Sequence, residues 1–194
     1  MKFRKMLLLV LTFTLLSGTV AYAADSIGQK IRIWINKKEV DSTSILVDKQ
    51  LYISSDLIGD KLQGILLWDE KDKKINIYRP NVHMLSRNGS TIFGEVNKGS
   101  KFKFNIFAQV DSLKVDLSAF KLTITEPYGE ETLIEARTTD DSNFPDKGKD
   151  NFWITTRDIL YSFDSAGVYT IKFWMRPSGE TTYQLVSEKA IMSR

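Results

Sequence analysis

The chain has no cysteine among its 194 residues. Disulfide bonds, a cysteine nucleophile, a thiolate metal site and a lipid-modified N-terminal cysteine are therefore all excluded. Because no covalent cross-link is available, the folded state must be stabilised by the burial of apolar side chains in packed cores.

Histidine is almost as rare, since His83 is the only one in the chain. Metal sites with several histidines are excluded by this count, and a Ser-His-Asp arrangement would depend on this single imidazole. His83 falls within residues 81–89, which are predicted to link two domains, so we expect it to be a linker or surface histidine. Nucleophilic catalysis is therefore poorly supported. If the protein is an enzyme, carboxylates are the catalytic groups that these residue counts do not exclude.

Long hydrophobic runs are also missing. The apolar residues 7–16 amount to about half of the ~20 residues that a membrane-spanning helix needs. Three basic residues precede this run, and Ala21-Tyr22-Ala23 follows it as a small-x-small cleavage site. This pattern predicts a secretory signal peptide over residues 1–23. We expect a mature protein that starts near Ala24, has no membrane span and is secreted or resides in the extracytoplasmic cell envelope.

A net charge of one sign is absent from the expected mature chain. The full sequence has 27 Lys and Arg against 24 Asp and Glu, and residues 1–23 contribute three basic and no acidic residues. The mature chain is therefore neutral, and it lacks the field that would attract phosphate backbones. Nucleic acid is not expected as a partner.

Residues 30–79 combine short strand patterns with one helical patch. In KIRIWIN, isoleucines alternate with Arg32, Trp34 and Asn36, as in a half-buried strand. SSDLIGDKLQG predicts a helix that is capped by a serine and ends in a left-handed residue at Gly64. These signals favour a small antiparallel sheet on one short helix.

LLWDEKDKKINIYRP, residues 66–80, contains six consecutive charged residues between two apolar stretches. Its three carboxylates could form a catalytic cluster, for which their pKa values would have to be pushed apart. Water and the interleaved lysines should instead keep the acids ionised. The stretch is therefore predicted to be two strands joined by a charged hairpin turn.

The sequence from residue 45 to 78, ILVDKQLYISSDLIGDKLQGILLWDEKDKKINIY, resembles the stalk, or copper amine oxidase N-terminal-like, domain of many secreted bacterial proteins. Trp68-Asp69 followed by a charged turn is the most specific part of the match. The resemblance implies such a domain over residues 27–80 and a core position for Trp68. It implies no cofactor, because the copper and the redox group of the amine oxidases belong to another domain.

Residues 84–194 consist almost entirely of strand and turn signals, and several short strands of this kind predict an immunoglobulin-like β-sandwich. In FDSAGVYTIKFWM, Tyr169, Ile171, Phe173 and Met175 share one face. The entry to this strand resembles that of the sixth strand of immunoglobulin-like domains, in which the tyrosine packs inward and its hydroxyl bonds a nearby backbone group. The whole chain is thus expected to be mostly β, with two domains.

Three tryptophans are the candidate binding residues. Trp34, Trp153 and Trp174 lie opposite the apolar faces of their predicted strands, where an indole can stack on a sugar or fill a pocket of a partner. The alternative is that they pack at the domain boundary or under a loop. The polar loop 142–151 and the nearby aspartates could hold calcium, but they lack the register of a calcium-binding loop, so a solvated loop is the competing interpretation.

We therefore expect an exported, non-catalytic binding or scaffold protein of the bacterial cell envelope. It would hold a protein or a wall polymer through an exposed strand edge or through outward aromatic side chains. A carbohydrate-binding module that uses Trp174 or Trp153 is the first alternative. A carboxylate-dependent hydrolase and an inhibitor that presents the loop 140–151 are the others.

Overall fold

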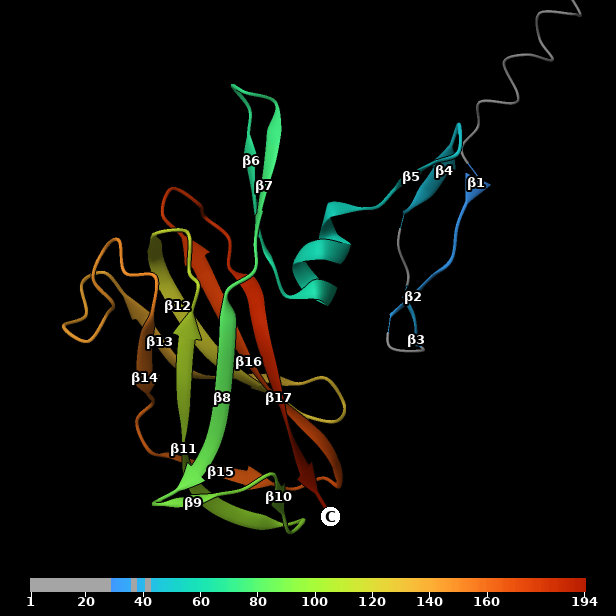
Figure 1. Ribbon diagram of the computed structural model, residues 1–194. Coiled ribbons are helices and arrows are strands. Elements are labelled where there is room, and N and C mark those ends of the chain that lie inside the picture. The colour runs from blue at the N-terminus through green and yellow to red at the C-terminus, as the bar shows by residue number, and fades with distance from the viewer. Residues whose placement is uncertain (1–28, 36–37, 41–42) are drawn as a thin grey trace, which may run out of the picture. The chain divides into compact units, whose positions relative to one another are not determined.

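The structure is a computed structural model, and it describes residues 29–35, 38–40 and 43–194. The predicted signal peptide, residues 1–23, lies outside the described residues. The chain divides into two compact units, Met1–Leu57 and Ile58–Arg194 (Figure 1). The predicted domain boundary near residues 80–84 falls inside the second unit.

Among its described residues, 29–35, 38–40 and 43–57, the first unit contains five short strands. An antiparallel sheet consists of β1 (Gln29–Lys30), β4 (Ile45–Val47) and β5 (Gln50–Tyr52), and a hairpin joins β2 (Ile33–Ile35) to β3 (Lys38–Val40). Asp48 and Lys49 form the two-residue connection between β4 and β5, with φ values of 49° and 64°. Positive φ at both positions gives the turn type whose twist matches that of paired strands.

The predicted helix is present as η1 (Leu57–Lys61), a short helix of the π type. At its start the Leu57 N–H donates to the carbonyl oxygen of Ser54 at 3.1 Å. The prediction that Gly64 takes the left-handed position is wrong, because Gln63 has the positive φ, 55°. The helix ends one residue earlier than the pattern indicated. Gly64 is instead buried, and a Cβ atom there would lie 3.5 Å from the Tyr78 carbonyl oxygen.

The charged stretch forms the predicted hairpin, which confirms that interpretation. Strands β6 (Ile65–Asp69) and β7 (Lys74–Tyr78) pair antiparallel. In the turn, the Asp72 N–H donates to Asp69 Oδ1 at 3.1 Å, and Lys73 Nζ lies 3.2 Å from Glu70 Oε1. The Asp72 N–H, with smaller help from Lys74, holds the pKa of Asp69 below its usual range. The turn therefore stabilises the ionised form of the Asp69 carboxyl.

The expected core position of Trp68 is wrong, since its side chain is 51% exposed. The alternation of β6 turns Ile65 and Leu67 toward the hydrophobic core, so Trp68 must face the other way. The hairpin is joined to strand β17 (Gln184–Ser193) through one side-chain amide. Gln184 donates to the Leu66 carbonyl oxygen at 3.0 Å and accepts from the Leu66 N–H at 2.7 Å.

Residues 81–88 form strand β8 (Asn81–Asn88), and the prediction of a linker there is wrong. The strand pairs along seven residues with β11 (Ser100–Asp111). Met84 and Ser86 are buried, whereas His83 is exposed on the other side. The alternation was obscured because both faces of the strand carry polar residues.

Two larger sheets make up most of the second unit. One has the order β10-β17-β16-β12-β13, and the other has the order β14-β11-β8-β9, with β15 also paired to β11. All pairs are antiparallel except β10 with β17. The remaining bounds are β9 (Thr91–Ile92), β10 (Glu95–Val96), β12 (Leu117–Thr125), β13 (Glu131–Thr138), β14 (Phe152–Thr155), β15 (Ile159–Phe163) and β16 (Gly167–Pro177).

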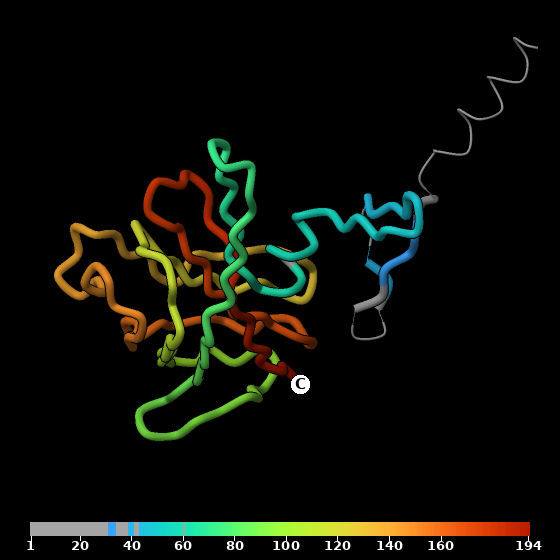
Figure 2. The backbone as a smooth tube through the Cα atoms, turned by 45° about the horizontal axis from the view of Figure 1, so that its top comes forward, coloured from blue at the N-terminus to red at the C-terminus, as the bar shows by residue number. Residues whose placement is uncertain are grey.

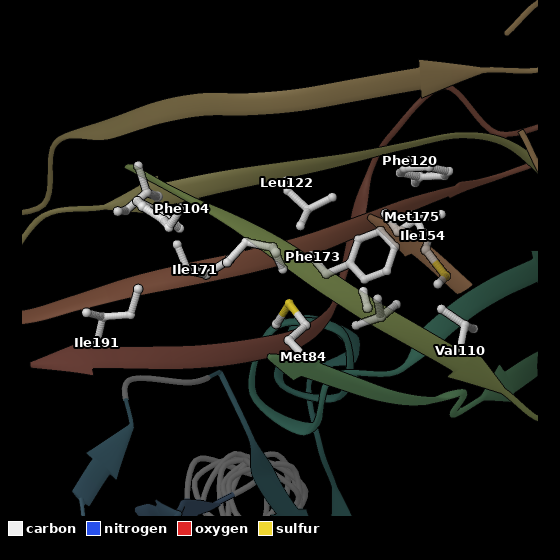
Figure 3. Packing of buried hydrophobic residues seen from close by; sticks show 14 of the residues in the cluster. Met84, Phe104, Val110, Phe120, Leu122, Ile154, Ile171, Phe173, Met175 and Ile191 are labelled. Atoms are coloured by element: carbon white, nitrogen blue, oxygen red, sulfur yellow. The ribbon is translucent and has the colours of Figure 1, made fainter. Parts of the chain in front are cut away.

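The two sheets share one hydrophobic core (Figure 3). The face of β16 that was predicted to point inward is confirmed, because Tyr169, Ile171, Phe173 and Met175 are fully buried. Aromatic contacts cross between the sheets, with ring centroids 4.9 Å apart for Phe163 and Tyr169. Each such side chain stabilises the fold by about 1.5–3 kcal/mol through burial alone.

Candidate functional site

The three candidate tryptophans do not converge on one site. Trp153 lies in β14 and Trp174 in β16, on the outer faces of different sheets. Trp34 lies in β2, where its backbone pairs with that of Glu39, and its side chain is outside the described part of the structure. Each tryptophan must therefore be judged by its own surroundings.

Trp174 is held by its neighbours on the outer face of its sheet. The indole Nε1–H donates to Thr123 Oγ1 at 2.9 Å, so its only polar group has a partner. The Lys121 and Lys172 ammonium groups lie 5.3 and 5.7 Å from the ring centroid. These distances are those of cation–π contacts. This indole is half-buried and already fully engaged within the protein.

The same contacts continue beyond Trp174. The Tyr183 ring lies 5.0 Å from the Lys121 ammonium and 5.3 Å from the Arg176 guanidinium carbon. Five side chains thus alternate between cationic and aromatic across two strands, β12 and β16, and the turn before β17. We call this series the outer-face ladder, and its members are Arg176, Tyr183, Lys121, Trp174 and Lys172. The outer-face ladder covers part of this sheet, and it gives Trp174 and Tyr183 a structural role.

Trp153 has the opposite character, because its side chain is 70% exposed. Its ring lies against that of Phe107 on β11, with centroids 6.2 Å apart and planes inclined by 26°. The Arg87 guanidinium carbon lies 5.0 Å from the Phe107 centroid, and Leu85 is paired with Phe107 on the next strand. We call Trp153, Phe107, Leu85 and Arg87 the Trp153 platform. It is a row of neighbouring side chains that crosses β14, β11 and β8.

A pocket of about 610 Å³ lies directly beside the Trp153 platform. One wall is β14, including Trp153, and the other is the long loop between β13 and β14, which Figure 2 shows in orange. The loop contributes Asn143, Phe144 and Pro145 to the lining. The predicted loop over residues 142–151 is confirmed, and it forms a wall of the pocket.

Arg137 lines this pocket and forms a buried ion pair with Glu135, which the sequence pattern did not indicate. Arg137 Nε lies 2.5 Å from Glu135 Oε1, and their side chains are only 13% and 8% exposed. Arg137 donates to the carbonyl oxygens of Thr155 at 2.8 Å and Asn143 at 3.4 Å. The Arg157 N–H donates to Glu135 Oε2 at 2.7 Å. The pair therefore ties β13 to β14 and to the loop.

A β-bulge explains why this pair was missed. The pairing of β12 with β13 shifts between Leu122 and Thr123, so that Leu122 lies opposite Glu135 and Thr123 lies opposite Leu133. A shift of one residue exchanges the two faces of a strand. The bulge turns Glu135 and Arg137 inward and leaves Leu133 exposed. A regular alternation of side chains along the strand would not indicate these orientations.

The loop carboxylates do not gather into a cation site. Within residues 29–35, 38–40 and 43–194, no three acidic or histidine side chains are placed to hold a metal ion. Asp141 accepts the Thr138 N–H at 2.7 Å, Asp150 faces Lys114 at 3.7 Å and Asp146 faces Lys149 at 3.9 Å. These three acids thus each have a partner within the protein.

No family model matches the chain, and no curated protein matches it. The resemblance of residues 27–80 to the stalk domains thus rests on the residues quoted above. Among the helices that the structure describes, none has the length and the apolar composition needed to cross a bilayer.

Proposed function

We propose that the protein is an exported, non-catalytic binding or scaffold protein of the bacterial cell envelope. In this proposal residues 27–80 are a stalk-like domain and residues 84–194 are an immunoglobulin-like β-sandwich. The two sheets with a shared core support the second assignment, as does the hydrogen bond between the Ser165 N–H and the Tyr169 hydroxyl at 3.0 Å. The signal-peptide pattern supports export.

The Trp153 platform is the binding surface in this proposal. The observation that carries it is the exposure of Trp153, whose ring lies against Phe107 at the edge of a pocket. A large, rigid ring that is left in water costs little conformational entropy when it binds, which makes it a good anchor for a partner. Trp174 is a weaker candidate, because the outer-face ladder already occupies it.

A non-catalytic role is supported by the state of the carboxylates. A general acid or base at neutral pH needs a pKa that is shifted toward 7. The pKa of Asp69 is lowered by the Asp72 N–H, and that of Asp158 is lowered by the Lys103 ammonium and the Asn105 amide. The buried Glu135 is neutralised by Arg137. The lowered pKa values and the ion pair favour a binding function over that of a carboxylate-dependent hydrolase.

A carbohydrate partner is favoured over a protein partner by the shape of the platform. The Trp153 indole is 70% exposed and only one of its faces lies against Phe107, so the other face can stack on the C–H face of a sugar ring. The experiment is to incubate the purified exported protein with bacterial cell-wall material and to assay both its retention and any turnover of the polymer. Retention without turnover is expected. Turnover that falls when one carboxylate is replaced would overturn the proposal.

A further inference from the structure

We propose that the pocket beside Trp153 is a subsite for a neutral, N-acetylated sugar, with the neighbouring sugars of the chain lying on the Trp153 platform. This inference rests on the proposed binding function and assigns it a ligand class. Four features of the pocket carry it: its charge balance, its volume, the chemistry of its walls and its rigidity.

The charges that line the pocket are balanced. Arg137 is paired with Glu135, and Lys149 Nζ lies 3.9 Å from Asp146 Oδ2. A charged ligand would therefore meet no unpaired opposite charge, and it would lose hydration without compensation. The pocket favours an uncharged ligand.

The volume and the walls fit a sugar with an amide substituent. About 610 Å³ lies within the range of roughly 300–1,000 Å³ that is usual for small-molecule sites. Phe144 and Pro145 offer apolar contacts and Asn143 offers a side-chain amide, whereas the Asn151 amide already donates to Asp150 Oδ1 at 2.9 Å. The Asn143 side chain makes no hydrogen bond within the described residues, so its donors and its acceptor are free for a ligand. An acetamido group has both a methyl group and an amide, and it can use both kinds of wall.

Arg137, which is paired with Glu135, links two segments that line the pocket. Arg137 donates to a loop carbonyl, that of Asn143, and to a β14 carbonyl, that of Thr155. The loop wall and the strand that carries Trp153 are therefore fixed by one guanidinium group. A site that is already formed loses less entropy on binding than one that must be ordered.

The inference is tested with two pentasaccharides that have the same β-1,4 linkage and differ at carbon 2 of each ring. One is built from N-acetylglucosamine and the other from glucose. Calorimetry with the purified exported protein should show binding of the acetylated sugar that is about tenfold tighter or more. Equal affinity for the two sugars, or no binding of the acetylated one, would overturn the inference.

Two variants and one matched control locate the site. Trp153→Ala should weaken binding of the acetylated sugar by about tenfold or more, whereas Trp68→Ala, at another exposed tryptophan, should leave it unchanged. Asn143→Ala should reduce the preference for the acetylated sugar and leave the affinity for the glucose oligomer unaltered. An unchanged preference in Asn143→Ala would contradict the assignment of the acetamido group to this pocket.

The failure of this inference can be told apart from the failure of the proposed function. If wall material retains the protein through Trp153 and the acetylated pentasaccharide does not compete, the subsite is wrong and the binding function stands. If wall material does not retain the protein at all, the proposed binding function itself is wrong. Competition by the acetylated sugar, without competition by the glucose oligomer, supports both.

Discussion

The backbone N–H of Ser165 donates a hydrogen bond to the hydroxyl oxygen of Tyr169 at 3.0 Å. The tyrosine ring is fully buried between the sheets, and the serine lies in the turn that leads into β16. A side chain of the core thereby fixes the connection between β15 and β16. It also satisfies a backbone group that would otherwise need water.

Tyr169→Phe should destabilise the fold by about 1–2 kcal/mol, because the ring still packs but the Ser165 N–H loses its acceptor. Urea unfolding of the exported protein measures this change. Tyr128→Phe is the matched control, since Tyr128 is 85% exposed and its substitution should have no effect. Equal stability of Tyr169→Phe and the parent protein would contradict the structural role of this bond.

Gly167→Ala should cost more stability than an alanine at another left-handed glycine. Gly167 has a φ of 135°, and a Cβ atom there would lie 2.9 Å from the Pro127 Cβ atom. Gly179 also has a positive φ, 87°, but a Cβ atom would meet no atom within 4 Å. Backbone strain of about 1–3 kcal/mol applies to both substitutions, and the clash applies to Gly167 alone. Similar melting temperatures of Gly167→Ala and Gly179→Ala would contradict the close approach to Pro127.

Arg137→Met should destabilise the protein by about 3–5 kcal/mol, because it leaves the Glu135 carboxylate buried without its partner. Adding Glu135→Leu should restore part of this loss, since the unpaired charge is then removed. Lys149→Met, which breaks an exposed pair with Asp146, should change stability by about 1 kcal/mol or less. Denaturant midpoints give all of these values, and a double variant no more stable than Arg137→Met would count against the buried-charge explanation.

The two tryptophans of the large sheets should differ in what they stabilise. Trp174→Ala should cost about 2 kcal/mol or more, because it removes a half-buried ring, a hydrogen bond and two cation–π contacts. Trp153→Ala should stay within about 0.5 kcal/mol of the parent protein, since its ring is mostly in water. Thermal unfolding compares them directly. The reverse order of stability would show that Trp153 has a structural role instead of a binding one.

The carboxyl of Asp69 should titrate at a lower pH than the same group in an unfolded peptide. The Asp72 N–H donates to its ionised form and lowers its pKa. The turn is therefore stabilised by this bond above the unfolded pKa, and the stabilisation is lost as the pH falls through the folded pKa. Carbon-detected NMR titration reads the midpoint, and a midpoint at or above the peptide value would contradict the turn geometry.

Local alternation made part of the fold predictable. The inward face of β16, the hairpin β6–β7 and the Tyr169 bond follow from patterns within single strands and turns. Such patterns are visible in the sequence because each depends on neighbouring residues only.

The rest of the fold and of the candidate site depends on pairings between residues that are distant in the sequence. Glu135 and Arg137 face inward because of a bulge against β12, and Trp68 is exposed because Ile65 and Leu67 of the same strand face the core. The Trp153 platform joins β14 to β11 and β8, and its pocket needs the loop wall. The sequence indicated that Trp153 points outward, but Phe107 and Arg87 could be placed beside it only by the pairing of strands.

Sedimentation with purified cell-wall material tests the central claim most directly. The exported protein, Trp153→Ala and Trp68→Ala would be incubated with the same material, and the bound fraction of each would be measured. The parent protein and Trp68→Ala are expected in the pellet, and Trp153→Ala is expected in the supernatant although it remains folded. Retention of Trp153→Ala equal to that of the parent protein would contradict the assignment of the binding surface.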